Sequence, residues 1–366
     1  MRPFTDERHD ELRARVERFA REPRPHADGA TRALADAGHL ALAVPAAYGG
    51  AFPAISPLAL AVAREALAGD QADCDAALAV QTLAAIPIAR AGAAEQRERW
   101  LRGLASGGER GAFALTEVGS GSDVASLETS ATHEGEGYRL DGEKVLISGA
   151  PSATAFVVFA RAGAEPRAIT AFVVPAATPG LSVAAVPNLG DHELGTVRFE
   201  GVWVPASARL GAEGDGLSLA LGALELMRPT VGAAACGMAA RALAETRAVV
   251  RGRKRGGVAL AEHESVRMKL AELATELEAA RLLVYRAAWL RESTPAHERL
   301  DAPSAMAKLF ATEAAGRIVD ACVQLHGGLG IVRGAVVERL YREVRALRIY
   351  EGASEVLQLV IARSLP

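Results

Sequence analysis

The chain has 366 residues; 50% of them are hydrophobic, 23% are charged, and the formal net charge is −3. This length exceeds what one hydrophobic core usually supports, so two or three domains are expected. The balanced charge provides no overall basic field, which argues against nucleic acid as a partner and requires any anion site to be local.

The sequence also carries information about the cellular compartment. Its N-terminus, MRPFTDERHDELRARVERF, is charged from the second residue and has no apolar core of signal-peptide length. No later apolar run without charges reaches membrane-spanning length. Cys74, Cys236 and Cys322 lie far apart, with no CxxC pair or histidine at metal spacing, so we expect small core residues and neither disulfides nor a metal site. A soluble, cytoplasmic protein with no membrane association is expected.

Apolar periodicity predicts helices from Asp6 to about Leu104. The positions that define them are Leu12, Val16, Phe19, Leu34, Leu40, Leu42 and the run from Leu58 to Leu67. Glycine and proline clusters at 45–53 and 106–111 mark breaks. We place an N-terminal α-helical domain at residues 1–110.

The pattern then changes to short β-branched runs. The strand and turn signals are TAFVVFA at Thr154, AITAFVV at Ala168, EGEG at Glu134 and the pair Asp141-Gly142. Such runs, with hairpin signals between them, predict an antiparallel β domain, which we place at residues 111–213.

Long helical segments return from Gly216 onward, with breaks around Gly256-Gly257, Pro295 and Gly327-Gly328. They define a C-terminal α-helical domain at residues 214–366. The resulting α+β order argues against a doubly wound dinucleotide-binding sheet, because strands do not alternate with helices and no GxGxxG joins a strand to a helix. Long Ala- and Leu-rich helices favour an oligomeric bundle, with a monomeric bundle as the alternative.

Two segments offer polar groups at strand ends. FALTEVGSGSD, residues 113–123, runs off a predicted strand, and its small residues with the hydroxyls of Thr116, Ser120 and Ser122 suit phosphate or the edge of a heterocycle. KVLISGA places Ser148 where another strand ends. Each segment alone could be an ordinary polar loop.

Charged residues of the C-terminal region provide two further candidates. The basic run from Arg247 to Arg255 is either an anion clamp or a solvated helix end. Glu351 follows an amphipathic helix and precedes Gly352, where the backbone can approach a ligand closely. It could instead be an acid that begins the next helix.

Taken in order, these segments resemble the flavin-dependent acyl-CoA dehydrogenases over nearly the whole chain. The motifs that carry the resemblance are LALAVPAAYGG, EQRERWLRGLASG, ALTEVGSGSD, DGEKVLISG, MRPTVGAAACGMA, the arginine run, QLHGGLG and IYEGASE. The resemblance implies an N-terminal helical domain, a middle antiparallel β domain, a C-terminal helical bundle and FAD as cofactor.

The resemblance also implies roles for individual residues. Glu351 matches the catalytic base that takes the α-proton of an acyl thioester while hydride passes to flavin N5. Positions that match FAD contacts are Phe113, Leu115, Thr116, Gly121, Ser122, Leu146, Ile147, Ser148, Arg253, Gln324, Gly327, Gly328, Ala353 and Glu355. Positions that match the substrate side are Ser122, Arg228 and Gly352, and Arg253 matches an arginine that reaches the FAD of a neighbouring subunit.

Some positions depart from the family pattern. Leu146 stands where many members have Trp, Gly256 replaces an aromatic residue, Ala353 replaces Thr and Gly334 replaces an acid. Some relatives carry their base immediately before the arginine matched by Arg228, where this chain has Met227, which takes no proton. Nearby Glu225 falls on a different helical face. These departures suggest a specialised member.

The implied function is α,β-dehydrogenation of an acyl group carried by CoA or by a carrier protein. The implied partners are electron transfer flavoprotein or a similar acceptor, and further copies of the chain in a homotetramer or homodimer. A flavin-dependent oxidase or monooxygenase of the same fold, in a specialised biosynthetic pathway, is the alternative. A non-catalytic flavoprotein scaffold is a third class, which the retained Glu351 disfavours.

Overall fold

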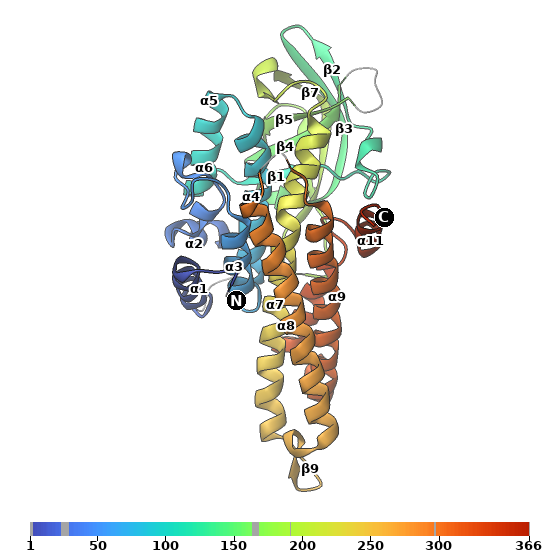
Figure 1. Cartoon of the computed structure of the whole chain (residues 1–366). Coiled ribbons are helices and arrows are strands. Elements are labelled where there is room, and N and C mark those ends of the chain that lie inside the picture. The colour runs from blue at the N-terminus through green and yellow to red at the C-terminus, as the bar shows by residue number, and fades with distance from the viewer. Residues whose placement is uncertain (1–2, 23–28, 163–167, 191, 296–297, 366) are drawn as a thin grey trace. The chain divides into compact units, whose positions relative to one another are not determined.

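The computed structural model describes every residue except 1–2, 23–28, 163–167, 191, 296–297 and 366. The chain forms two compact units, which we describe separately (Figure 1). The helical unit comprises Met1–Arg24, Pro57–Asp75 and Glu225–Pro366, and the sheet unit comprises Pro25–Ser56 and Ala76–Leu224. These units follow packing and not chain order, so the expected three-domain boundaries stay a prediction.

The helical unit is built on long helices from both ends of the chain. They are α1 (Glu7–Ala20), α3 (Pro57–Ala68), the start of α4 (Ala72–Ala91), most of α7 (Gly216–Gly252), α8 (Glu264–Ser293), α9 (Asp301–His326), α10 (Val336–Leu347) and α11 (Ser354–Ala362). A small hairpin of β9 (Lys254–Arg255) and β10 (Val258–Ala259) joins α7 to α8. The predicted breaks at the glycine pairs and at Pro295 are confirmed, because each lies between helices.

Helix α10 shows why the segment before Glu351 is helical. Its apolar side chains Leu340, Val344 and Leu347 are buried on one face, as the spacing predicts. The helix ends at Leu347 and α11 begins only at Ser354, so Glu351 lies in the turn between two helices and begins neither. The alternative in which Glu351 starts the next helix is therefore wrong.

Helices α3 and α7 cross at glycines. A Cβ atom on Gly237 of α7 would lie 2.1 Å from the backbone oxygen of Glu65 in α3, and one on Gly69 would lie 2.8 Å from Cβ of Arg241. Only glycine allows backbones to approach this closely, so the crossing is fixed by residue size.

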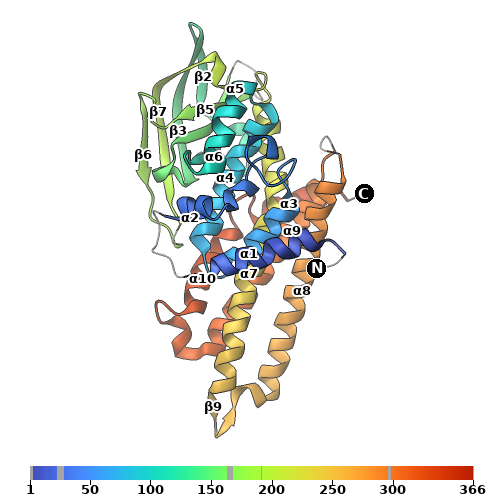
Figure 2. The same ribbon diagram turned by 90° about the vertical axis from the view of Figure 1, so that its left-hand side faces the viewer.

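The sheet unit combines short helices with one large sheet. Its elements are α2 (Ala30–Asp36), the remainder of α4, α5 (Ala94–Gln96), a π-helical turn (Arg97–Leu101), α6 (Arg102–Ser106), β1 (Gly111–Ala114), β2 (Ser130–Glu134), β3 (Gly137–Ser148), β4 (Ala155–Arg161), β5 (Ile169–Pro175), β6 (Leu181–Ala185), β7 (Leu194–Pro205) and β8 (Arg209–Leu210). The strand order is β6-β7-β3-β2-β4-β5-β8, and β1 pairs with β4 (Figure 2).

Two details of the sheet differ from expectation. Most strand pairs are antiparallel, but β1 runs parallel to β4, and β2 meets β4 in a parallel bridge at Ser130 and Arg161. The EGEG hairpin is confirmed between β2 and β3. Asp141-Gly142 is not a turn: it lies inside β3 at a register shift against β7, where Gly142 adopts a φ of 146°. The turn signal there arises from a bulge, which also favours glycine.

Most of the buried side chains in both units are apolar, and the three cysteines are buried, as predicted for core residues. Helices α4 and α7 are long and apolar enough to cross a membrane by composition alone, with 56% and 78% of their apolar windows buried. Buried core helices pass the same test, so this is weak evidence for a membrane span.

The α3–α7 crossing generates a stability prediction. Gly237→Ala should lower the free energy of unfolding by about 1–3 kcal/mol, because the added methyl group collides with backbone. Gly252→Ala, in the same helix with nothing within 4 Å of its Cβ, is the matched control and should be close to neutral. Chemical unfolding of both variants checks this, and equal stabilities would contradict the close crossing.

Candidate functional site

Glu351 adopts a backbone conformation that side chains rarely occupy. Among the described residues, Leu146 and Glu351 alone combine a side chain with a positive φ, at 56° and 53°. Gly352 follows with a φ of 103°. A left-handed conformation at a residue with a side chain is unfavourable and persists only where the surroundings enforce it.

Two cationic side chains hold this turn from neighbouring helices. Arg228 Nε on α7 donates to the carbonyl of Glu351 at 3.3 Å, and Lys308 Nζ on α9 donates to the carbonyl of Gly352 at 2.7 Å. Ser354 closes the turn by donating its backbone N–H to Arg348 O at 3.2 Å. The conformation of Glu351 is thus imposed by contacts on its main chain, which leaves its side chain free for chemistry.

The Glu351 carboxylate has an unusual environment. Its Oε2 atom is buried and has no hydrogen-bond partner, although the residue as a whole is partly exposed. Burial raises the pKa of Glu351, and the charges of Arg64, Lys308 and Arg228 oppose this rise. A buried carboxylate with a free oxygen and a raised pKa has the properties of a general base.

The cations around Glu351 are themselves buried. Lys308 is fully inaccessible to solvent, and this burial lowers its pKa to about 8 despite the opposing charge of Glu351. Burial also lowers the pKa of Arg228. Arg64 and Asp75 form a further buried ion pair. The charge of Arg64 lowers the pKa of Glu351, and the charge of Asp75 raises it.

The neighbouring acid and methionine on α7 do not offer a second base. Glu225 accepts hydrogen bonds from Arg291 Nη1 and from the backbone N–H of Leu300, both at 3.1 Å, so its carboxylate is engaged in structure. Met227 is fully buried.

In the sheet unit, the loop after β1 is tied to the end of β3. Val145 donates its backbone N–H to the carbonyl of Thr116 at 2.9 Å. The buried Lys144 donates to the carbonyl of Leu115 at 3.1 Å and to Glu117 Oε1 at 2.7 Å. Burial lowers the pKa of Lys144 to about 8, although the Glu117 charge acts in the opposite direction.

The same loop carries an unpartnered hydroxyl. Ser120 Oγ is buried without a hydrogen-bond partner, and Gly121 and Ser122 beyond it are exposed. An orphaned polar atom beside exposed small residues fits a loop that receives polar groups of a ligand.

Leu146 is the second left-handed residue, and it presents its side chain to solvent. It is 57% exposed, between the buried Lys144 and the buried Ile147, where β3 shifts register against β7. Ser148 ends the strand and is partly exposed, and Phe113 in β1 packs on the ring of Phe159. An exposed, strained leucine next to a polar loop is consistent with a flat apolar ligand at this edge.

A third group of predicted residues lies elsewhere in the helical unit. Arg253 donates through Nη1 to the carbonyl of His326, beside Gly327, and Gln324 and Gly328 are exposed nearby in sequence. Figure 1 draws the β9 hairpin that follows Arg253 at one end of the bundle, remote from α11. The structure therefore does not bring this group to Glu351 within one chain, and Ala353 and Glu355 remain on the Glu351 side.

Sequence reasoning missed the buried charges that support the site: Arg64, Asp75, Glu117, Lys144 and Lys308. A signal for two of them was present. Arg64 interrupts the apolar run PLALAVAREALA, and Lys308 lies in a similar run, AMAKLFA, so each charge falls where the helical pattern predicts burial. In the described part of the chain, no three His, Cys, Asp or Glu side chains gather to hold a metal ion.

Comparison with known proteins identifies the class to which this fold and site belong. Profiles of the acyl-CoA dehydrogenase N-terminal, middle and C-terminal domains match residues 2–108, 112–202 and 214–365. The chain therefore belongs to the acyl-CoA dehydrogenase family, whose members are FAD-dependent oxidoreductases that dehydrogenate acyl thioesters.

Three relatives illustrate the match. Human mitochondrial short-chain specific acyl-CoA dehydrogenase is 37% identical, over 90% of this chain and 80% of its own. A subunit of the caffeyl-CoA reductase–Etf complex of Acetobacterium woodii is 36% identical, over 78% of this chain and 76% of its own. The structure of a glutaryl-CoA dehydrogenase from Mycobacterium smegmatis in complex with FADH2 superposes with a TM-score of 0.90 at 26% identity, over 99% of this chain and 95% of that one.

The strain at Leu146 can be measured directly. Leu146→Gly should be more stable than Leu146→Ala by about 1–2 kcal/mol, because glycine adopts a positive φ without a steric penalty. This reverses the usual order at strand positions, where alanine is better than glycine. Chemical unfolding in the absence of added flavin tests it, and the ordinary order would contradict the left-handed backbone.

Proposed function

We propose that the protein dehydrogenates an acyl thioester between its α- and β-carbons, with Glu351 as the base that takes the α-proton. The observation that carries this proposal is the buried, unpartnered Oε2 of Glu351 on a backbone held in a strained turn. A structural carboxylate in that position would be expected to have a hydrogen-bond partner. An oxygen left free at such a cost is available for a substrate proton.

The residues of the sheet unit fit FAD. Leu146 and Ile147 offer an apolar edge for a flat ring, and Ser120 and Ser122 offer hydroxyls for its polar groups. When bound, FAD supplies the acceptor for the hydride that leaves the β-carbon. We propose on this basis that the residues matching the family's FAD contacts bind FAD in this chain.

Proton abstraction requires a stabilised enolate, because a thioester α-proton is too weakly acidic to be lost at neutral pH otherwise. The backbone N–H of Gly352, next to the base, is proposed to donate to the thioester carbonyl. Arg228 is proposed to act through the main chain, since its contact is with the carbonyl of Glu351. Burial raises the pKa of Glu351, which makes its carboxylate a stronger base, and the charges of Arg64, Lys308 and Arg228 oppose this rise.

The family and the exposed apolar residues of the chain support proposals for an acyl carrier, an electron acceptor and further copies of the chain as partners. We propose that CoA or a carrier protein holds the acyl group and that an electron transfer flavoprotein accepts the electrons; the relative from Acetobacterium is part of an Etf complex. A homodimer or homotetramer is proposed because Arg253, apart from Glu351 in its own chain, matches an arginine that serves a neighbouring subunit. The apolar side chains of Leu329, Ile331 and Val332, each more than half exposed, would be covered in such an assembly.

The central test replaces one atom of the base. Glu351→Gln should retain FAD. Under anaerobic conditions, the rate at which acyl thioesters bleach its flavin should fall by about 10² to 10⁴. Glu225→Gln is the control, because it changes another buried carboxylate, one that binds Arg291 and the backbone of Leu300. This variant should retain flavin bleaching. Full activity in Glu351→Gln would contradict the assignment, and rapid oxygen uptake without an acceptor would favour the oxidase alternative.

A further inference from the structure

A second carboxylate lies at the turn that carries the proposed base. Glu313 on α9 accepts a hydrogen bond from Arg348 Nε at 2.8 Å through Oε1, and Arg348 Nη2 lies 2.8 Å from Oε2. The same Oε1 accepts from the hydroxyl of Ser354 at 2.5 Å. Arg348 is the C-cap residue of α10, and Ser354 is the first residue of α11. One carboxylate therefore binds both ends of the turn in which Glu351 lies.

The main chain closes the turn between the same two residues. Ser354 donates its backbone N–H to Arg348 O at 3.2 Å, so both residues take part through backbone and side chain. Ala353, the N-cap residue of α11, has no polar side chain and makes no capping hydrogen bond. At this end of the turn, the side-chain anchor is the Ser354 hydroxyl bound to Glu313.

The contacts of Glu313 are charge-assisted and partly buried. The side chains of Glu313 and Arg348 are 24% and 37% exposed. Burial alone would raise the pKa of Glu313, but the hydrogen bonds from Ser354 and Arg348 outweigh it and hold that pKa below its usual range. The stem of Arg348 also lies along α9, since a Cβ atom on Gly316 would lie 3.7 Å from Arg348 Cδ. An ionised carboxylate with a two-point arginine contact fixes direction as well as distance.

Glu313 complements the two cations that hold the middle of the turn. Arg228 and Lys308 bind the carbonyls of Glu351 and Gly352, whereas Glu313 binds the residues at the two ends. Lys308 and Glu313 both lie on α9, so this helix holds the turn in the middle and at the ends. A left-handed backbone at Glu351 persists only while its surroundings enforce it.

We propose that Glu313 is a positioning residue for proton abstraction: by binding Arg348 and Ser354 together, it keeps the turn closed. This inference rests on the proposed function of Glu351 and adds a residue to the same site. Loss of the Glu313 carboxylate frees both ends of the turn, so the backbone of Glu351 relaxes toward an ordinary conformation and moves its carboxylate from the α-carbon. A displacement of about 1 Å in a catalytic group can lower a rate about 10²-fold.

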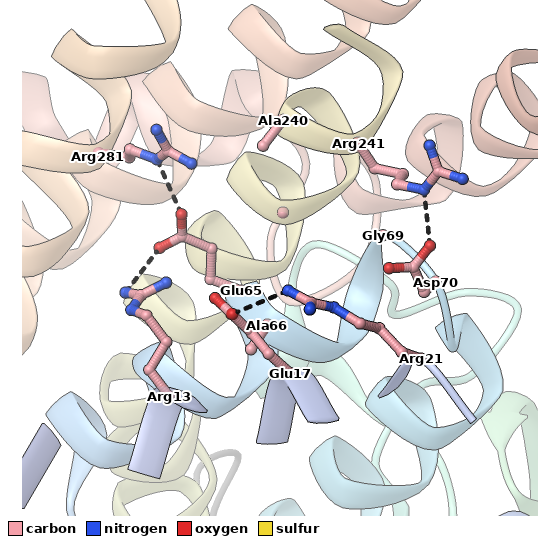
Figure 3. A pocket seen from close by; sticks show the side chains of 11 residues that line it. Arg13, Glu17, Arg21, Glu65, Ala66, Gly69, Asp70, Ala240, Arg241 and Arg281 are labelled. Atoms are coloured by element: carbon pink, nitrogen blue, oxygen red, sulfur yellow. Dashed lines mark hydrogen bonds and ion pairs between the residues drawn. The ribbon is translucent and has the colours of Figure 1, made fainter. Parts of the chain in front are cut away.

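A comparable pair of side chains lies outside the turn and supplies a control. Arg241 Nε on α7 donates to Asp70 Oδ1 at 2.7 Å, and the two side chains are 31% and 39% exposed. Figure 3 shows this pair at a cavity of about 210 Å³ that is lined by residues of α1, α3, α7 and α8. Asp70→Ala removes an arginine–carboxylate contact of similar exposure, so it measures the effect of a general loss of stability.

The experiment follows anaerobic flavin reduction by butyryl-CoA in FAD-bound protein. Glu313→Ala should retain FAD and lower the limiting rate of flavin reduction by about tenfold to 10²-fold. The thioester concentration that gives half of this rate should stay close to that of the wild type, because the position of the base changes and the thioester site does not. Asp70→Ala should keep the wild-type limiting rate.

A conservative variant tests whether the contacts of the carboxylate matter and not only its presence in the fold. Glu313→Gln keeps the shape of the side chain, and its amide oxygen can still accept from Ser354, but its amide nitrogen cannot accept from Arg348. Its limiting rate should therefore lie between those of Glu313→Ala and the wild type. A wild-type limiting rate in Glu313→Ala, or an equal loss in Asp70→Ala, would overturn the proposal.

Hydrogen exchange at the Ser354 amide tests the turn without turnover. This amide donates to Arg348 O, so Glu313→Ala should lose its protection from exchange, whereas Asp70→Ala should keep it. Unchanged protection in Glu313→Ala would overturn the proposal whatever the reaction. If no acyl thioester reduces the wild-type flavin, the proposed function fails, and the exchange result alone decides whether Glu313 holds the turn.

Discussion

The hydrogen bonds that Arg228 and Lys308 donate to the Glu351–Gly352 main chain are the contacts on which the site depends. They enforce a left-handed backbone at a residue that would otherwise avoid it. The two donors lie on α7 and α9, so the packing of these two long helices determines where the Glu351 carboxylate lies. The glycine crossing of α3 on α7 adds a third helix to this support.

A buried lysine that donates to a main-chain carbonyl lies near each of the two strained residues, Glu351 and Leu146. Lys308 holds the carbonyl of Gly352, and Lys144 holds the carbonyl of Leu115 in the loop beside Leu146. Each lysine is fully buried and has its pKa lowered to about 8 by that burial. Burying an ammonium group lowers the stability of the fold. Two buried lysines that each hold a main-chain carbonyl therefore indicate that the backbone at these sites is fixed at the expense of stability.

Sequence periodicity was sufficient for much of the fold. The apolar spacing of Leu340, Val344 and Leu347 predicts α10, and the β-branched run at Thr154 predicts β4. The pair Asp141-Gly142 predicts a turn, but the structure has a bulge there, and both structures favour glycine. Long-range pairs such as Arg64 with Asp75 were not predictable, because they depend on how two helices pack and leave no periodic signal. Motifs located Glu351, but its strained backbone appears only in three dimensions.

The central claim is that Glu351 itself removes the α-proton, and isotope exchange tests this step alone. Protein whose flavin has been reduced beforehand cannot accept hydride, so it reports proton abstraction without turnover. In D2O with butyryl-CoA, the wild type should introduce deuterium at the α-carbon, and Glu351→Gln should not, while both bind the thioester. Exchange at the wild-type rate in Glu351→Gln would show that another group takes the proton.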